Sequence, residues 1–142
     1  MNYTILSNII KLCVQYYKPD TFQHCLRVAK YAASNPAISN NDERDIVYGM
    51  ALCHDLIEDT SCTYEEIAEA SVGSIDYIKN VIGLLTRQSN ESYEEYICRL
   101  RSSKNKHAYI IKLCDIKDHL EQKETLTDSL KKRYLSILPV LL

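Results

Sequence analysis

Apolar residues recur at steps of three and four along most of the chain, which is the spacing of helices that bury one face. In the first segment, Ile5, Ile9 and Leu12 share one stripe, and Pro19 ends it, because the residue before a proline is pushed out of the α-helical region. Caps and breaks divide the rest of the chain in the same way. We predict about seven to eight helices: a first ending near residue 18, then about 20–33, 41–58, 63–71, 75–87, 92–100, 107–120 and 128–138.

Length and composition support one helical domain. The 142 residues and 16.4 kDa suit a single core, expected over residues 1–142. Three glycines and three prolines are too few for the many turns of a sandwich or barrel. Hydrophobic residues at 46% and charged residues at 25% are ordinary for a globular protein. We therefore expect an all-α, single-domain helical bundle.

Charge and hydropathy narrow the choice of partner. Seventeen basic and nineteen acidic side chains give a net charge of -2, which provides no broad positive field for nucleic acid. No apolar run reaches the roughly 20 residues that span a bilayer, and the start lacks the pattern of a signal peptide. We expect a cytoplasmic protein whose main partner is neither nucleic acid nor a membrane, and the pattern favours no oligomeric state. The cysteines at 13, 25, 53, 62, 98 and 114 form no CxxC pair, so we expect buried, reduced thiols.

The segment ALCHDLIEDT, residues 51–60, carries the strongest chemical signal. It places His54 and Asp55 among apolar residues and follows them with Glu58 and Asp59. On one continuous helix, residues four apart stack on a single face, which would pair His54 with Glu58 and Asp55 with Asp59. Burying such groups without partners costs several kcal/mol per ion. A divalent cation would compensate for that cost.

Two further residues are candidate ligands for the same cation. Imidazole and carboxylate together suit manganese, iron or zinc, and a complete site needs ligands from more than one helix. His24 and Asp115 are lone titratable residues in apolar helical segments. Taken singly, such a histidine is a hydrogen-bonded core residue and such an aspartate a cap or ion-pair partner. Together with His54 and Asp55, they favour a metal site.

The order of these residues resembles the H…HD…D motif of the HD-domain metal-dependent phosphohydrolases. The segments QHCLRVAKYAA and IIKLCDIKDHL are similar to the helices that carry the family's first histidine and last aspartate. Residues 54–60, HDLIEDT, resemble more closely the HDxxEDT motif of the RelA/SpoT-type guanosine tetraphosphate (ppGpp, an alarmone) hydrolases and their small stand-alone relatives. The resemblance implies an HD-domain helical bundle that hydrolyses the 3′-pyrophosphate of guanosine tetraphosphate or pentaphosphate.

The resemblance also implies a role for each motif residue. One divalent cation is expected, Mn²⁺ first, with Fe²⁺, Zn²⁺ and Mg²⁺ as alternatives; its implied ligands are His24, His54, Asp55 and Asp115. Glu58 and Asp59 would orient the attacking water or move its proton. The alternative for this acidic pair is a solvated helix end.

The substrate implied is a small anionic nucleotide, so cations should line the mouth of the site. Arg27, Arg87 and Lys112 are the candidates, and each could equally form a surface salt bridge. His119 occupies the position at which relatives carry an asparagine that touches the ribose. This departure favours one alternative, an HD phosphohydrolase for another nucleotide. A second alternative is a non-catalytic HD domain that binds a nucleotide or a protein, and the intact set of ligand types and the Glu58-Asp59 pair speak against it. We expect His107, which follows a basic loop, to be exposed.

Overall fold

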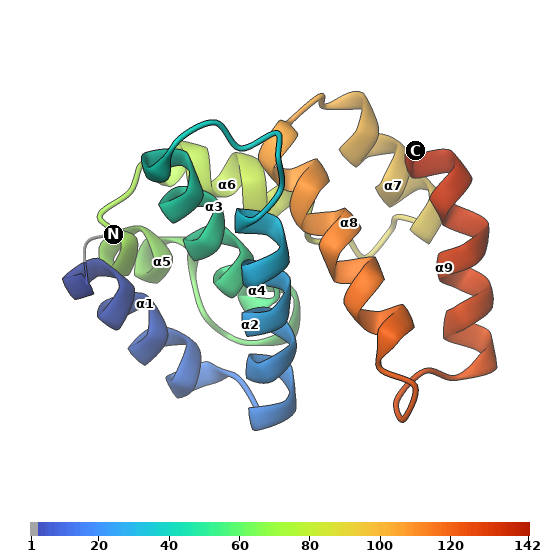
Figure 1. Cartoon of the computed structure of the whole chain (residues 1–142), viewed down its shortest axis with the longest axis horizontal. Coiled ribbons are helices and arrows are strands. Elements are labelled where there is room, and N and C mark those ends of the chain that lie inside the picture. The colour runs from blue at the N-terminus through green and yellow to red at the C-terminus, as the bar shows by residue number, and fades with distance from the viewer. Residues whose placement is uncertain (1–2) are drawn as a thin grey trace.

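The computed structural model describes residues 3–142, and the all-α prediction is confirmed for them (Figure 1). These described residues form nine helices and no strand. The helices are α1 (Tyr3–Tyr16), α2 (Pro19–Ala33), α3 (Asn41–Cys53), α4 (Leu56–Asp59), α5 (Tyr64–Ser71), α6 (Ile75–Leu84), α7 (Tyr93–Ser102), α8 (Lys106–Glu121) and α9 (Asp128–Leu141).

The predicted continuous helix 41–58 is wrong, because it breaks after Cys53 and restarts at Leu56. At the break, the carbonyl of Ala51 accepts from the peptide N–H of His54 at 3.3 Å, one residue earlier than in an α-helical ladder. The hydroxyl of Tyr17 donates to the carbonyl of Leu52 at 2.7 Å and accepts from the N–H of Asp55 at 3.2 Å. A side chain from outside the helix thus satisfies the backbone groups that the break releases.

Polar side chains define most of the helix starts. Each such side chain accepts a hydrogen bond from the backbone N–H three residues later, which satisfies a donor that has no partner inside the helix. At two of the starts a glutamate returns the bond and completes a capping box. The capping residues are Asn40, Thr63, Ser74, Ser92, Asn105 and Thr127.

The helices α2 and α8 lie side by side near the middle of the molecule (Figure 1). α2 packs most extensively against α3 and also against α8, while α8 meets α7 and α9 on its other side. Val28 and Ala29 on α2 and Ile111 on α8 have no exposed surface, so each of the two helices contributes small or branched side chains to the core. This packing brings the polar residues of α2 and α8 to one shared interface.

Three further sequence predictions concern the cysteines, membrane-spanning helices and His107. Five of the six cysteines are buried and free, as expected, whereas Cys98 is exposed. No helix within residues 3–142 is both long enough and apolar enough to cross a membrane. His107 is not exposed: it is half-buried, with its Nε2 3.1 Å from Glu43 Oε2 and its Nδ1 2.7 Å from the Tyr77 hydroxyl. These bonds join α8 to α3 and α6.

Glu43 gives the fold a pH dependence that can be measured. Its carboxylate accepts from the N–H of Ser39, from His107 and from Lys106, and these bonds lower the pKa of Glu43 to about 2. A lowered pKa in the folded state adds stability above the unfolded value of 4.5, and this stability is lost as pH falls towards 2. We expect Glu43→Gln to destabilise the protein at pH 7 and to lose most of that effect by pH 3 in urea unfolding.

The matched control for this prediction is Glu94→Gln. Glu94 is exposed and forms no ion pair within the described part of the chain. Its replacement should leave the urea midpoint unchanged at both pH values. A difference between wild type and Glu43→Gln that stays constant from pH 7 to pH 3 would contradict the assignment.

Candidate metal centre

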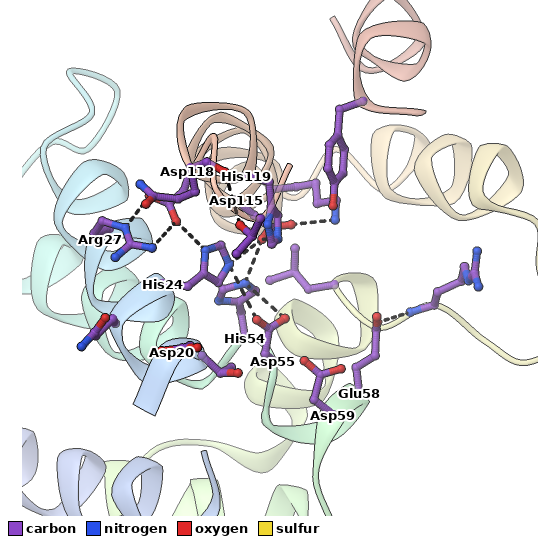
Figure 2. Close-up of a pocket in the computed structure, with 18 of the residues that line it drawn as sticks. Asp20, His24, Arg27, His54, Asp55, Glu58, Asp59, Asp115, Asp118 and His119 are labelled. Atoms are coloured by element: carbon purple, nitrogen blue, oxygen red, sulfur yellow. Dashed lines mark hydrogen bonds and ion pairs between the residues drawn. The ribbon is translucent and has the colours of Figure 1, made fainter. Parts of the chain in front are cut away.

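Three separate segments bring four of the predicted residues to one point (Figure 2). α2 contributes His24, the break between α3 and α4 contributes His54 and Asp55, and α8 contributes Asp115. One ligand atom from each residue lies within 4.8 Å of the ligand atoms of the other three. His24, His54 and Asp115 are buried, and Asp55 is half-buried at the edge of the cavity. His24 Nε2 and Asp115 Oδ1 lie 2.8 Å apart, although the two residues are 91 positions apart in sequence.

The backbone fixes the orientation of His54. Its Nδ1 lies 2.6 Å from the carbonyl oxygen of Ala51, so Nδ1 carries the proton and donates it. Nε2 then faces Asp55 Oδ1 at 3.3 Å and Asp115 Oδ1 at 3.4 Å. The same helix break that frees the Ala51 carbonyl therefore aims His54 into the centre.

A carboxylate that the sequence analysis missed fixes the orientation of His24. Asp118 has no exposed surface and accepts from His24 Nδ1 at 2.7 Å, which turns Nε2 towards Asp115 Oδ1 at 2.8 Å. Arg27 donates to both oxygens of Asp118, at 2.7 and 3.0 Å. Asp118 follows Asp115 by three residues, just as Arg27 follows His24. This shared spacing on two helices is the sequence signal that could have indicated a role for Asp118.

The donor set fits a divalent cation. Burial by itself lowers the pKa of the His54 imidazole, but the charges of Asp55 and Cys25 and the hydrogen bonds with Asp115 and Cys25 together outweigh burial and raise that pKa well above its usual range. Burial likewise opposes a charge on His24, while its hydrogen bond to Asp115 raises the pKa. Two imidazole nitrogens and two carboxylates thus converge, with both Nδ1 protons held on the far side. This is the arrangement of metal-ligating histidines whose other nitrogen donates to a carboxylate or carbonyl.

Lys112 is buried, whereas the sequence analysis expects it at the mouth of the site. Its side chain is 9% exposed, its Nζ is 2.8 Å from Asp115 Oδ2, and the rings of Tyr93 and Tyr96 lie 5.6 and 5.1 Å from it. Burial raises the pKa of an isolated carboxyl, but the charge of Lys112 together with the hydrogen bonds from His119, His24 and His54 reverses this and holds the pKa of Asp115 well below its usual value. Because Oδ2 is engaged by Lys112, Oδ1 is the oxygen that Asp115 offers to the centre.

The acidic pair on α4 lies beside the four candidate ligands (Figure 2). Glu58 Oε2 accepts from the peptide N–H of Arg87 at 2.9 Å, which ties α4 to the loop that follows α6. Partial burial, followed by the charges of Asp55 and Glu58, raises the pKa of Asp59 to about 6. A carboxyl with such a pKa exchanges a proton readily near neutral pH.

A cavity of about 500 Å³ opens above the centre, a size typical of small-molecule sites. All ten residues singled out from the sequence line it. The predicted cations Arg27 and Arg87 lie along it, and α9 adds Arg133 and Tyr134. The sequence analysis did not identify these two α9 residues as part of the site. On an amphipathic helix, the pattern predicts a solvent-exposed arginine and a tyrosine in the core.

Loss of the Asp118 carboxylate should weaken metal binding without removing a ligand. We expect Asp118→Ala to raise the Kd for Mn²⁺ by about 10- to 100-fold, because His24 loses the partner that orients its ring. Titration of metal-free protein in competition with a chelating dye measures this shift. Asp128→Ala, an exposed acid in the first turn of α9, is the control and should leave the Kd unchanged. An unaltered Kd for Asp118→Ala would show that His24 does not need Asp118.

Comparison with known proteins adds one family match. The family model described as "HD domain" matches residues 21–130, which include all four candidate ligands, Asp118 and the first turn of α9. No curated protein matches the chain.

Proposed function

Because the chain belongs to the HD domain family, we propose that it is a cytoplasmic alarmone hydrolase, which removes pyrophosphate from the 3′ position of guanosine tetraphosphate or pentaphosphate. Proteins with this domain are generally metal-dependent phosphohydrolases. The observation that carries the proposal is the convergence of His24, His54, Asp55 and Asp115 at the floor of a cavity lined by arginines. The HDxxEDT pattern at residues 54–60 supports the choice of substrate.

These four residues would hold the cation, for which Mn²⁺ is our first choice. When bound, a divalent cation lowers the pKa of water and polarises a phosphoryl oxygen, so it supplies both a nucleophile and an electrophile for hydrolysis. Asp118, the Ala51 carbonyl and Lys112 keep His24, His54 and Asp115 in place for this purpose.

Asp59 and Glu58 would manage the proton of the attacking water. Asp59 has a pKa of about 6, so its carboxylate form is available at neutral pH to accept a proton. Glu58 is held by the peptide N–H of Arg87, which keeps a second acceptor next to the first. We propose that Asp59 takes the proton and that Glu58 orients the water.

Cations along the cavity would bind the phosphates. Arg87 and Arg133 are exposed at the cavity and form no ion pair within residues 3–142, so their guanidinium groups are available to phosphate oxygens. Arg27 shares its charge with Asp118, and Lys112 with Asp115. We therefore assign phosphate binding first to Arg87 and Arg133.

A nucleotide panel tests the proposal. The full chain is loaded with Mn²⁺ and given guanosine tetraphosphate, a nucleoside monophosphate and a deoxynucleoside triphosphate. We expect pyrophosphate to be released from the tetraphosphate alone. Orthophosphate from the monophosphate would instead favour a phosphohydrolase for another nucleotide, an alternative that His119 keeps open. Protein that binds Mn²⁺ but turns over none of the three would favour a non-catalytic binding domain.

A further inference from the structure

The His119 imidazole points at the same oxygen as the two candidate histidine ligands. His119 follows Asp115 by one helical turn on α8, and its Nε2 lies 3.2 Å from Asp115 Oδ1. The Nε2 atoms of His24 and His54 lie 2.8 and 3.4 Å from that same oxygen. Figure 2 shows His119 and Asp115 together above His24. Three imidazoles from three segments therefore surround one carboxylate oxygen.

We propose that His119 is a third imidazole ligand of the metal centre. The inference rests on the metal centre of the proposed function, and it concerns a residue outside the H…HD…D motif. It assigns the departure at position 119 to metal binding rather than to contact with a sugar.

The separations match those of neighbouring ligands on one ion. At metal–ligand distances of about 2.1 Å, two ligands at right angles lie about 3 Å apart, and the centroids of two such imidazoles lie about 4.5 Å apart. His119 Nε2 and Asp115 Oδ1 are 3.2 Å apart, and the ring centroids of His119 and His24 are 4.3 Å apart. The two rings stack with an interplanar angle of 28°, so His119 lies directly beside His24 at the edge of the centre.

The surroundings of His119 leave its Nε2 available. Its side chain is 37% exposed, and its Nδ1 forms no hydrogen bond within the described residues, so a solvated proton can occupy Nδ1. The ring stacks on Tyr134 with centroids 5.4 Å apart and planes 6° apart, which limits its rotation. His119 is not among the four residues whose ligand atoms all lie within 4.8 Å of one another. His119 would therefore have to turn within its stack on Tyr134, in the plane of its own ring, for Nε2 to reach an ion held by those four residues.

A third imidazole has a consequence for metal choice. Nitrogen ligands suit borderline first-row ions, whereas Mg²⁺ prefers carboxylate, carbonyl and water oxygens. A centre of three imidazoles and two carboxylates therefore favours Mn²⁺, Fe²⁺, Co²⁺ or Zn²⁺ over Mg²⁺ more strongly than the four-residue set alone.

Metal titration of two variants tests the inference without any assay of hydrolysis. Co²⁺ is the probe, because its visible absorption reports its ligands, and Mg²⁺ is titrated in parallel. His119→Ala removes the side chain. His119→Gln places an amide N–H near the original Nε2, so it can still donate to Asp115 Oδ1 but is a poor metal ligand. The matched control is His107→Gln, which alters a histidine bonded to Glu43 and Tyr77 instead.

The expected result is that both His119 variants raise the Kd for Co²⁺ by at least about 10-fold, the scale on which residues that merely hold a ligand act. Both should also change the Co²⁺ spectrum, while the Kd for Mg²⁺ changes far less and His107→Gln matches wild type. Wild-type affinity and spectrum in His119→Gln, with or without a loss in His119→Ala, would overturn the inference and leave the proposed function intact. A wild-type protein that binds no Co²⁺ would overturn both.

Discussion

Asp55→Asn is expected to lower kcat/KM for hydrolysis by about 10³-fold or more, even at saturating Mn²⁺. The amide has the same size as the carboxylate but lacks its charge, and it is a weaker ligand for a divalent cation. A cation that holds and polarises a phosphoryl group supplies several kcal/mol of transition-state stabilisation, and each 1.36 kcal/mol is a factor of ten in rate. Pyrophosphate release measured over a range of substrate concentrations gives the ratio, with far-UV circular dichroism to confirm folding.

The control for this prediction is Asp20→Asn. Asp20 lines the same cavity from the first turn of α2 but does not belong to the set of four (Figure 2). Its replacement should change kcat/KM by only a few fold. Full activity in Asp55→Asn together with unchanged Mn²⁺ affinity would remove Asp55 from the centre and contradict the proposed mechanism.

The sequence was sufficient to find the candidate ligands because each is polar in an otherwise apolar helical segment. His24 and Asp115 lie on the faces through which α2 and α8 pack, so burial and proximity have one cause. Helix starts were also predictable where Thr63 and Ser92 are followed three residues later by glutamate. These signals come from residues that are close together in sequence, and such short-range patterns are the ones that a single sequence reveals most directly.

The features that sequence analysis missed depend on contacts between distant residues. The break at residues 54 and 55 relies on the Tyr17 hydroxyl, which is 38 positions from Asp55 and forms its bonds only in the folded chain. Asp118 gains its role only because Arg27 and His24 face it from α2. At the end of α5, Val72 rather than the neighbouring Gly73 adopts the left-handed conformation, with φ of 52°. The general preference for glycine at the left-handed position that ends a helix would therefore select Gly73, which is the wrong residue.

Lys112→Met is expected to destabilise the metal-free protein by about 3 kcal/mol or more, because removal of one partner of a buried ion pair is strongly destabilising. Asp115 would keep its contacts with histidines but lose the full positive charge 2.8 Å from Oδ2. Addition of Mn²⁺ should restore much of the loss, since a bound cation also neutralises that carboxylate. Urea unfolding in the presence of a chelator, and again with Mn²⁺, measures both effects.

The matched control for Lys112→Met lies on the same helix. Lys117 pairs with Glu121 at 2.8 Å, but its side chain is 51% exposed, and such surface pairs contribute about 0 to 1 kcal/mol. Lys117→Met should therefore change the free energy of unfolding by less than about 1 kcal/mol, with or without Mn²⁺. If Lys112→Met were as stable as Lys117→Met in chelator, Lys112 would not act as the counter-charge of Asp115. Its ammonium group would then be free for substrate phosphate, as the sequence alone suggests, and the loss would be found in KM instead.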